Sequence, residues 1–286
     1  MSTGPFLSAC LSVDYRSKRG VLRDLKLQMR AGEVLGLVGQ SGSGKSTIAL
    51  AIIRLLDLKG GTVTGSVLLQ GRDLMQLRER EMRHVRGREI GLVLQSPLSS
   101  LNPAMRIGRQ LSEAWRAHAS AKTQDCQLAV REALRSVSLP DDDPFLRRYP
   151  AQLSVGQAQR LLIAIAIINR PALLIADEPT SALDVITQAE ILALFRQLNR
   201  TRGVSILYIS HDLVSVASIC DRVAILHEGE IVECAATEQI FHRPAHPYTR
   251  LLIAAQPGLF SKSAVSMTDT GRSTTPAPRV TSTATM

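Results

Sequence analysis

Aromatic residues are scarce in this chain of 286 residues, where Phe, Trp and Tyr together make up only 3%. The formal net charge of +9 is compatible with a nucleic-acid partner, an anionic membrane surface or simply a basic surface. No basic run is interleaved with aromatic side chains in the way that a single-strand nucleic-acid groove requires. We therefore expect no nucleic-acid partner.

Cysteine is also sparse, and its spacing excludes thiolate metal sites. The four cysteines, Cys10, Cys126, Cys220 and Cys234, lie far apart and form no C-x-x-C pair. They are typical of reduced thiols in a cytosolic protein. Residues 7–10 are similar to a lipoprotein cleavage box, but no basic residue precedes them and the apolar stretch is too short for a signal peptide. We expect no lipidation.

Long apolar runs are missing as well. The longest, from Leu161 to Ile168, has eight residues, whereas a membrane-spanning helix needs roughly 20. If the protein works at a membrane, we expect it to do so through a partner.

A glycine-rich segment lies between two apolar runs, 34–38 and 48–53. It comprises Gly39, Gln40, Ser41, Gly42, Ser43, Gly44, Lys45, Ser46 and Thr47. A strand, a glycine loop and a helix in this order predict a phosphate-binding loop, whose backbone N–H groups and helix N-terminus face anionic oxygens. Lys45 is expected to reach the β- and γ-phosphates, and the Ser46 hydroxyl to bind Mg²⁺. The motif indicates a nucleoside triphosphatase.

The rest of the sequence alternates strands with helices, which predicts a mainly parallel sheet covered on both faces and hence an α/β fold. Two strands are expected within 7–30, and others at 63–69, 90–94, 173–177, 204–209, 223–226 and 231–232. Helices are expected at 48–56, 74–86 and 186–198. The stretch 96–103 is expected to break regular structure, because it carries two prolines among small polar residues.

Two adjacent carboxylates, Asp177 and Glu178, follow the apolar run 173–176 and so lie at the edge of the sheet that also receives the phosphate loop. We expect Asp177 to hold Mg²⁺ through water and Glu178 to be the general base for the attacking water. Gln95 and His211 also follow strands. A glutamine can bind Mg²⁺ and a histidine can contact the γ-phosphate, although each alone also fits an ordinary polar residue at a strand–loop junction.

The spacing of these parts favours adenine over guanine. Asp177 comes 132 residues after Lys45 (177 − 45), whereas a small GTPase places the two parts much closer together. No N-K-x-D guanine-binding motif occurs. Tyr15, a lone aromatic before the loop, is either a platform for adenine or a strand residue packed on its own sheet.

Together these parts resemble the ATP-binding-cassette (ABC) family over residues 7–256. The resemblance implies an adenine platform at Tyr15, a Q-loop at Gln95 and a switch histidine at His211. It implies a signature motif at 153–157 and a D-loop at 181–184, which includes Ser181 and Asp184. The fold it implies is a P-loop ABC nucleotide-binding domain with an antiparallel β subdomain and a helical insertion, binding ATP and Mg²⁺.

In this family two cassettes face head to tail, and the signature of one completes the ATP site of the other. Ser154, Gly156 and Gln157 are therefore expected to contact ATP in the opposite subunit. Val155 departs from the family pattern, which has glycine at that position. We expect activity despite this change, which removes backbone freedom.

Two segments, 95–103 and 246–252, are similar to segments of the bacterial oligopeptide/dipeptide/nickel importers. This resemblance implies an ABC ATPase domain over 1–260, with a helical insertion at about 105–160 and a short C-terminal helical extension at about 236–258. Many such subunits hold an iron–sulfur cluster in a cysteine-rich C-terminal segment, but no cysteine follows Cys234, so no cluster is expected. Residues 261–286 are rich in Ser, Thr and Pro and are expected to be a disordered tail.

The resemblance implies an ATP-hydrolysing subunit that energises uptake of di- or oligopeptides, with nickel or a metal chelate as the alternative cargo. Its partners would be two integral-membrane permeases, a second ABC ATPase that we expect to be a different chain, and indirectly an extracytoplasmic solute-binding protein. The implied location is the cytoplasmic face of the bacterial inner membrane. A soluble cassette of DNA repair or translation is the alternative of a different class, but this chain lacks a long coiled coil and holds only one cassette.

Overall fold

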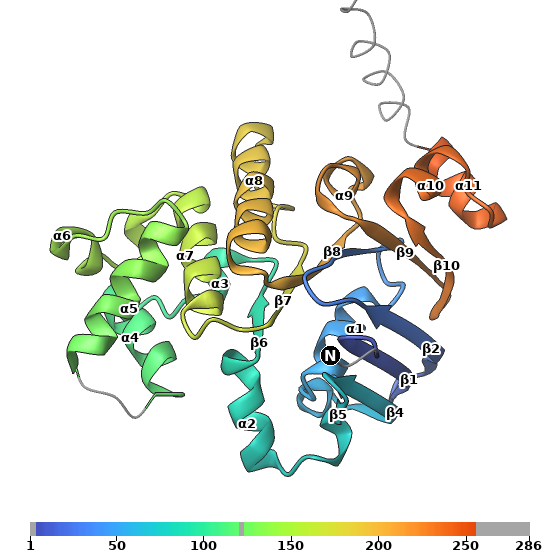
Figure 1. Ribbon diagram of the computed structural model, residues 1–286, viewed down its shortest axis with the longest axis horizontal. Helices are drawn as coiled ribbons and strands as arrows, with labels where there is room; N and C mark the ends of the chain where they lie inside the picture. The colour runs from blue at the N-terminus through green and yellow to red at the C-terminus, as the bar shows by residue number, and fades with distance from the viewer. Residues whose placement is uncertain (1–3, 120–122, 256–286) are drawn as a thin grey trace, which may run out of the picture.

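The computed structural model describes residues 4–119 and 123–255, which form two β-sheets and a group of helices at one side (Figure 1). The larger sheet has six strands in the order β10-β9-β3-β8-β7-β6. Their bounds are β3 Val34–Val38, β6 Ile90–Val93, β7 Leu173–Asp177, β8 Ser205–Ser210, β9 Arg222–His227 and β10 Glu230–Ala236. All pairs are parallel except β9 with β10, which confirms the predicted mainly parallel sheet.

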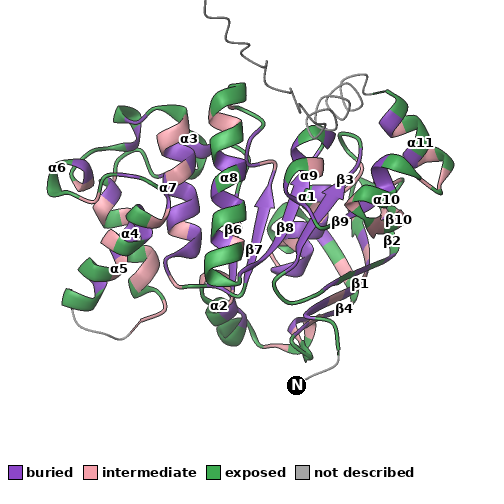
Figure 2. Cartoon of the chain, turned by 45° about the horizontal axis from the view of Figure 1, so that its top comes forward, coloured by how far each residue is buried: buried purple, intermediate pink, exposed green. Residues whose placement is uncertain are grey.

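The central strands of this sheet are buried on both faces (Figure 2). Alternate residues of one strand enter two separate apolar clusters: in β7, Leu173 and Ile175 enter one cluster and Leu174 and Ala176 the other. This is why the strand sequences are continuously apolar instead of alternating with polar residues.

The smaller sheet is antiparallel, with the order β2-β1-β4-β5. Its bounds are β1 Leu7–Tyr15, β2 Lys18–Met29, β4 Gly61–Leu69 and β5 Arg72–Asp73. Its apolar face shares one cluster with the helix α1 (Lys45–Ile52). The phosphate loop thus lies between the core strand β3 and the helix α1, whose buried residues share one apolar cluster with residues of both sheets.

Helices fill the connections. Those between β4 and β7 are α2 Glu79–Arg88, α3 Pro97–Ser100, α4 Ile107–Arg116, α5 Thr123–Ser136, α6 Asp143–Leu146 and α7 Val155–Ile167, and those after β7 are α8 Val185–Arg202, α9 Leu213–Ile219, α10 Thr237–His242 and α11 Pro247–Ala254. Short 3₁₀ turns lie at Leu56–Lys59, Leu74–Gln76 and Pro150–Gln152. Figure 1 shows α4 to α7 grouped beside the sheet, and α10 and α11 beside β9 and β10 at the other side.

Three local expectations differ from the structure. The helix predicted at 74–86 is divided into the 3₁₀ turn Leu74–Gln76 and α2, which begins at Glu79, because Leu77 and Arg78 are extended. The helix predicted at 48–56 begins at Lys45 and ends at Ile52, because Arg54 adopts a left-handed backbone (φ 53°) that a helix cannot continue through. The stretch 96–103, expected to be irregular, contains the one-turn helix α3, in which Pro97 occupies the first position, where its missing N–H costs nothing.

No helix in the described part of the chain is long and apolar enough to cross a bilayer. The predicted tail, 261–286, and the last residues of the predicted C-terminal extension lie outside the described residues.

Candidate functional site

The sheet order brings the predicted ATP-site residues to one edge. Strands β3, β8 and β7 are parallel neighbours, with Val38 opposite Ser210 and Asp177 opposite Ile209. The chain therefore delivers the phosphate loop after β3, the acidic pair at the end of β7 and His211 after β8 to the same place. Gln95 arrives from β6, the next strand along.

The phosphate loop depends on its glycines for two different reasons. A Cβ on Gly39 would lie 2.5 Å from the Leu226 carbonyl oxygen, so the close packing of β9 excludes a side chain there. Gly44 has φ +106°, and a Cβ would lie 2.8 Å from Leu22 Cδ2. Gly42 has space around it but a left-handed φ of +78°.

The loop has the chemistry of an anion site. Lys45 is buried and donates from Nζ to the carbonyl oxygens of Gly39 (2.8 Å) and Gln40 (3.0 Å). Burial lowers the pKa of Lys45, with Glu178 and Asp177 acting in the opposite direction. The Ser43 hydroxyl is buried and has no hydrogen-bond partner within the described part of the chain. A cation, an unpaired hydroxyl and the N-terminus of α1 gathered in one loop fit a triphosphate.

The residues expected to hold Mg²⁺ also fit that ion. Asp177 is buried, and its Oδ1 has no hydrogen-bond partner among the described residues. Burial raises the pKa of Asp177, while the Ser46 hydroxyl lowers it by hydrogen bonding. No group of three or more His, Cys, Asp or Glu side chains that could hold a metal occurs within 4–119 and 123–255. Ser46 and Asp177 would thus supply only part of an oxygen shell, as is usual for Mg²⁺ beside phosphates.

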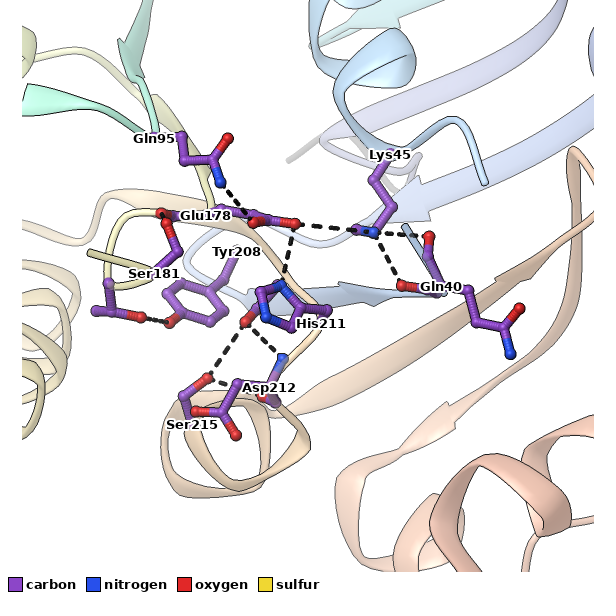
Figure 3. Close-up of polar contacts among 12 residues, drawn as sticks. Gln40, Lys45, Gln95, Glu178, Ser181, Tyr208, His211, Asp212 and Ser215 are labelled. Carbon is purple, nitrogen blue, oxygen red and sulfur yellow. Dashed lines mark hydrogen bonds and ion pairs between the residues drawn. The ribbon is translucent and has the colours of Figure 1, made fainter. Parts of the chain in front are cut away.

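Glu178 lies at the centre of the polar cluster in Figure 3. Its Oε2 accepts a hydrogen bond from Gln95 Nε2 at 2.9 Å, and its Oε1 lies 3.2 Å from His211 Nδ1 and 3.8 Å from Lys45 Nζ. The Glu178 backbone is left-handed (φ 47°) and is held by its N–H, which donates to the Ile209 carbonyl. Three sequence-predicted residues thus contact the predicted base directly.

A small cavity of about 210 Å³ opens beside this cluster. It is lined by Glu178, Thr180, Ser181, Leu183, Gln188, Ser210, His211 and Asp212. The Ser181 hydroxyl donates to the Glu178 carbonyl oxygen at 3.1 Å, which ties the predicted D-loop to the predicted base. A larger hollow of about 450 Å³, bordered by Trp115 and His118, contains none of the predicted site residues, so its size does not indicate the ATP site.

Tyr15 lies next to the loop, as an adenine platform requires. It is half-buried at the end of β1, and its hydroxyl lies 3.2 Å from the Thr47 hydroxyl. This contact supports placement beside the site but leaves the stacking role a prediction.

The signature residues form a separate structure at the start of α7. The Ser154 hydroxyl accepts from the Gln157 N–H (3.2 Å), and Gln157 Oε1 accepts from the Ser154 N–H (3.1 Å), which is a reciprocal capping box. In the described part of the chain, none of the hydrogen bonds or ion pairs of Ser154, Gly156 or Gln157 involves the phosphate loop. Figure 1 shows α7 among the helices at the left and α1 beside the smaller sheet at the right.

The signature instead contacts the start of α8. Asp184 caps that helix by accepting from the N–H groups of Ile186 (3.1 Å) and Thr187 (3.0 Å), and it also accepts from the Thr187 hydroxyl (2.7 Å). These bonds to Thr187 are the main cause of the lowered pKa of Asp184. A Cβ on Gly156 would lie only 2.8 Å from Thr187 Cγ2. Thr187 therefore joins the predicted D-loop to the signature helix, a link that no sequence motif indicated.

Other supporting residues also escaped the sequence reasoning. The buried Tyr208 hydroxyl lies 3.2 Å from the Thr180 hydroxyl, and Gln188 Nε2 donates to Asp212 at 2.7 Å (Figure 3 shows Tyr208 and Asp212). These two contacts fix the segments that follow Glu178 and His211. The only available signal was a single tyrosine among the aliphatic residues and serines of β8.

An α/β core with a phosphate loop, an acidic pair ending a buried strand and a helical region beside the sheet define a nucleotide-binding cassette. A family model described as "ABC transporter" matches residues 22–181, and the chain belongs to this family. A second model, "Oligopeptide/dipeptide transporter, C-terminal region", matches residues 232–279. The predicted family and importer subfamily are thereby confirmed. The second match includes residues 261–279, which were assigned to the tail.

Named relatives are similar over most of this chain. It is 45% identical over 250 residues to the glutathione import ATP-binding protein GsiA of Escherichia coli (strain K12) and 44% identical over 250 residues to GsiA of Shigella dysenteriae serotype 1 (strain Sd197). Each match covers 85% of this chain and 40% of the relative. The chain therefore spans less than half the length of the curated relatives it matches.

Solved structures confirm the predicted fold. The dimeric structure of the ATP-binding cassette MJ0796 in a post-hydrolysis state, bound to ADP and Pi, is similar with a TM-score of 0.68 and 26% identity, covering 81% of this chain and 98% of that one. The cbiO1 structure from Clostridium perfringens has a TM-score of 0.72 at 24% identity, covering 88% and 96%. At that identity the second likeness concerns the fold alone.

Proposed function

We propose that the chain is the ATP-binding and ATP-hydrolysing subunit of an importer of the oligopeptide/dipeptide class, and that it energises uptake through separate permeases. The observation that carries this proposal is the contact of Glu178 with Gln95, His211 and Lys45 beside a phosphate loop. This arrangement puts a base, its orienting groups and a phosphate-binding cation within one site.

Binding uses groups that the fold has already positioned. Tyr15 offers a face to adenine, the loop N–H groups face the phosphates, and the Lys45 ammonium pairs with the β- and γ-phosphate oxygens. Ser46 and Asp177, with the Gln95 amide oxygen, are the proposed Mg²⁺ ligands. When bound, Mg²⁺ neutralises phosphate charge. Because Gln95 donates from Nε2 to Glu178, its amide oxygen remains available for that role.

Hydrolysis depends on Glu178. Its carboxylate accepts the proton of the attacking water, and the Gln95 and His211 contacts hold the carboxylate in one orientation. The cavity beside it is large enough for water and is lined by Ser181 and His211. Lys45 stabilises the charge that develops on the phosphoryl oxygens.

A second cassette is needed to complete the site. The signature residues Ser154, Gly156 and Gln157 lie at a surface apart from their own phosphate loop. Apolar side chains near these residues are exposed to solvent: Val155 is 41% exposed, Val185 82% and Ile186 75%. Exposed apolar residues that lie together mark partner surfaces, and the close approach of Gly156 to Thr187 brings the segments of these three residues into one region. We propose a head-to-tail pair with a sister ATPase, with a homodimer as the alternative; the MJ0796 cassette structure is dimeric.

The proposed cargo is a small peptide. The named relatives import glutathione, which is itself a tripeptide, and the C-terminal match is to the oligopeptide/dipeptide class. Nickel or a metal chelate remains the alternative cargo. The proposed site of action is the cytoplasmic face of a bacterial inner membrane, beneath two permeases that receive cargo from an extracytoplasmic binding protein. The helical insertion at 105–160 and the C-terminal extension at 236–258 are proposed as parts of the cassette.

Affinity purification of the tagged chain from its own cells tests this assignment. Recovery with two multi-span permeases, and ATP turnover stimulated by loaded binding protein in reconstituted vesicles, is the expected result. Adding peptide, glutathione or Ni²⁺ to the binding protein distinguishes the cargo classes. Recovery with ribosomes or DNA and without permeases would overturn the importer assignment in favour of a soluble cassette.

A further inference from the structure

The C-terminal helix α11 contributes a tyrosine to the surroundings of the phosphate loop. The Tyr248 ring stacks on the His227 ring, with centroids 3.7 Å apart and planes inclined by 21°. The Tyr248 hydroxyl oxygen is buried and has no hydrogen-bond partner among the described residues. A buried hydroxyl left unpaired is costly, so its retention indicates a partner in another state of the protein.

The stacked pair lies against the beginning of the loop. His227 ends β9, the strand that pairs with β3, and the preceding Leu226 carbonyl is the group that excludes a side chain at Gly39. The backbone N–H of Gln40 is near enough to the Tyr248 hydroxyl to act on its pKa, although the two form no full hydrogen bond. Burial raises the pKa of Tyr248, and this N–H acts against the rise.

The position of Tyr248 is set by the C-terminal part of the chain. The Glu233 carboxylate on β10 accepts hydrogen bonds from the N–H groups of Ala245 (2.8 Å) and His246 (3.0 Å). His246 Nδ1 in turn accepts from the Tyr248 N–H at 3.2 Å, which caps α11. A displacement of α11 would therefore move the Tyr248 hydroxyl relative to Gln40.

The loop carbonyls beside Tyr248 are the ones that Lys45 holds. Lys45 Nζ donates to the carbonyl oxygens of both Gly39 and Gln40, and the Gln40 carbonyl also accepts from the Ser43 N–H. When the Lys45 ammonium turns to a phosphate oxygen, the Gly39 carbonyl loses this bond, whereas the Gln40 carbonyl keeps the Ser43 N–H at 3.2 Å. The Gly39–Gln40 peptide group can then rotate. The Tyr248 hydroxyl is then placed to accept the Gln40 N–H and fix the rotated peptide.

We propose that Tyr248 is a positioning residue for the phosphate loop and that it couples the C-terminal helix α11 to ATP binding. This inference rests on the proposed ATP site. It assigns a role to the C-terminal region inside the cassette itself: the order of α11 and the affinity for ATP depend on each other, because coupling between two sites is reciprocal.

Tyr248→Phe tests the hydroxyl while keeping the ring and its stack on His227. Loss of one hydrogen bond predicts roughly 3- to 10-fold weaker binding of Mg²⁺–AMP-PNP, with a matching rise in KM for ATP and an unchanged kcat. Tyr149→Phe is the matched control, since Tyr149 is partly exposed and lies between α6 and α7. This control variant should bind Mg²⁺–AMP-PNP as tightly as the wild type. A merely structural role would instead lower the thermal midpoint of the nucleotide-free variant.

Hydrogen exchange provides the reciprocal measurement. Mg²⁺–AMP-PNP should slow exchange of the α11 amides 250–254 in the wild type and in Tyr149→Phe, and the slowing should be lost in Tyr248→Phe. Equal affinity and equal protection in the wild type and Tyr248→Phe would overturn the coupling. Failure of the wild type itself to bind AMP-PNP would instead refute the proposed ATP site, so the two failures are distinguishable.

Discussion

The Lys45 ammonium lies 3.8 Å from the Glu178 carboxylate, which joins the phosphate loop to the end of β7 across the sheet edge. Both side chains are largely removed from water, so each charge is compensated by the other where solvent screening is weak. The phosphate-binding cation and the proposed base are therefore positioned together. Substituting Lys45 should weaken ATP binding, whereas substituting Glu178 should slow ATP turnover and leave binding intact.

Removal of the cation should affect binding first. Lys45→Ala is expected to weaken Mg²⁺–ATP binding by about 10- to 100-fold, because charge-assisted hydrogen bonds to the phosphates are lost. Equilibrium titration with a non-hydrolysable analogue measures this. Lys26→Ala is the control, since Lys26 pairs with Asp24 on the exposed surface and its loss should leave affinity unchanged. Wild-type affinity in Lys45→Ala would remove Lys45 from the site.

Removal of the base should leave binding intact. Glu178→Gln keeps the shape of the side chain and its hydrogen bond to Gln95 but cannot accept a proton. Turnover should fall by about 10²-fold or more, and the assembled pair of cassettes should accumulate in Mg²⁺–ATP. Phosphate release and sedimentation measure the two effects. Undiminished phosphate release would exclude Glu178 as the base.

Local sequence patterns predicted much of this site. The apolar run, the glycines and Lys45 specify the strand, loop and helix, because each residue type satisfies a backbone requirement within a few residues. The contacts of Glu178 could not be predicted in the same way. They depend on the strand order β3-β8-β7-β6, which brings together segments from residues 40 to 211. Their residue types were predicted, but their pairing requires the tertiary structure.

Two further residues show where the sequence stops being informative. Tyr248 belongs to the segment 246–252, which resembles a segment of the importers, but nothing local relates it to a loop about two hundred residues earlier. Arg54 ends α1 through a left-handed backbone, although arginine is a good helix former. In both cases packing against distant elements decides the conformation.

The burial of Asp177, the acid at the end of β7, should lower the stability of the folded protein. Because burial raises the pKa of Asp177 from its usual 3.8, the charged form is disfavoured in the folded state. The cost is absent below the unfolded-state pKa, grows as pH rises through the folded-state pKa and is fully present near neutral pH. Asp177→Asn should therefore raise the thermal midpoint of the nucleotide-free protein by roughly 2–4 °C near neutral pH, and by less near pH 4.

The same variant should lose turnover, since a neutral amide at position 177 no longer supplies the negative charge that pairs with Mg²⁺. Asp57→Asn, at an exposed position, is the control and should change neither property. Differential scanning calorimetry at two pH values measures the effect. A variant less stable than the wild type near neutral pH would contradict the desolvation argument.

The contact between the signature helix and α8 gives a prediction with a built-in rescue. Gly156→Ala places a methyl group 2.8 Å from Thr187 Cγ2, which must push α7 away from the D-loop cap at Asp184. Turnover should fall about tenfold, with ATP affinity kept, because the phosphate loop is untouched. Thr187→Ser removes Cγ2 but keeps the hydroxyl that donates to Asp184, so alone it should behave like the wild type. The double variant should recover most of the lost turnover, with a coupling of roughly 1 kcal/mol in the double-mutant cycle. Additive losses in the double variant would show that Thr187 does not limit the space at Gly156.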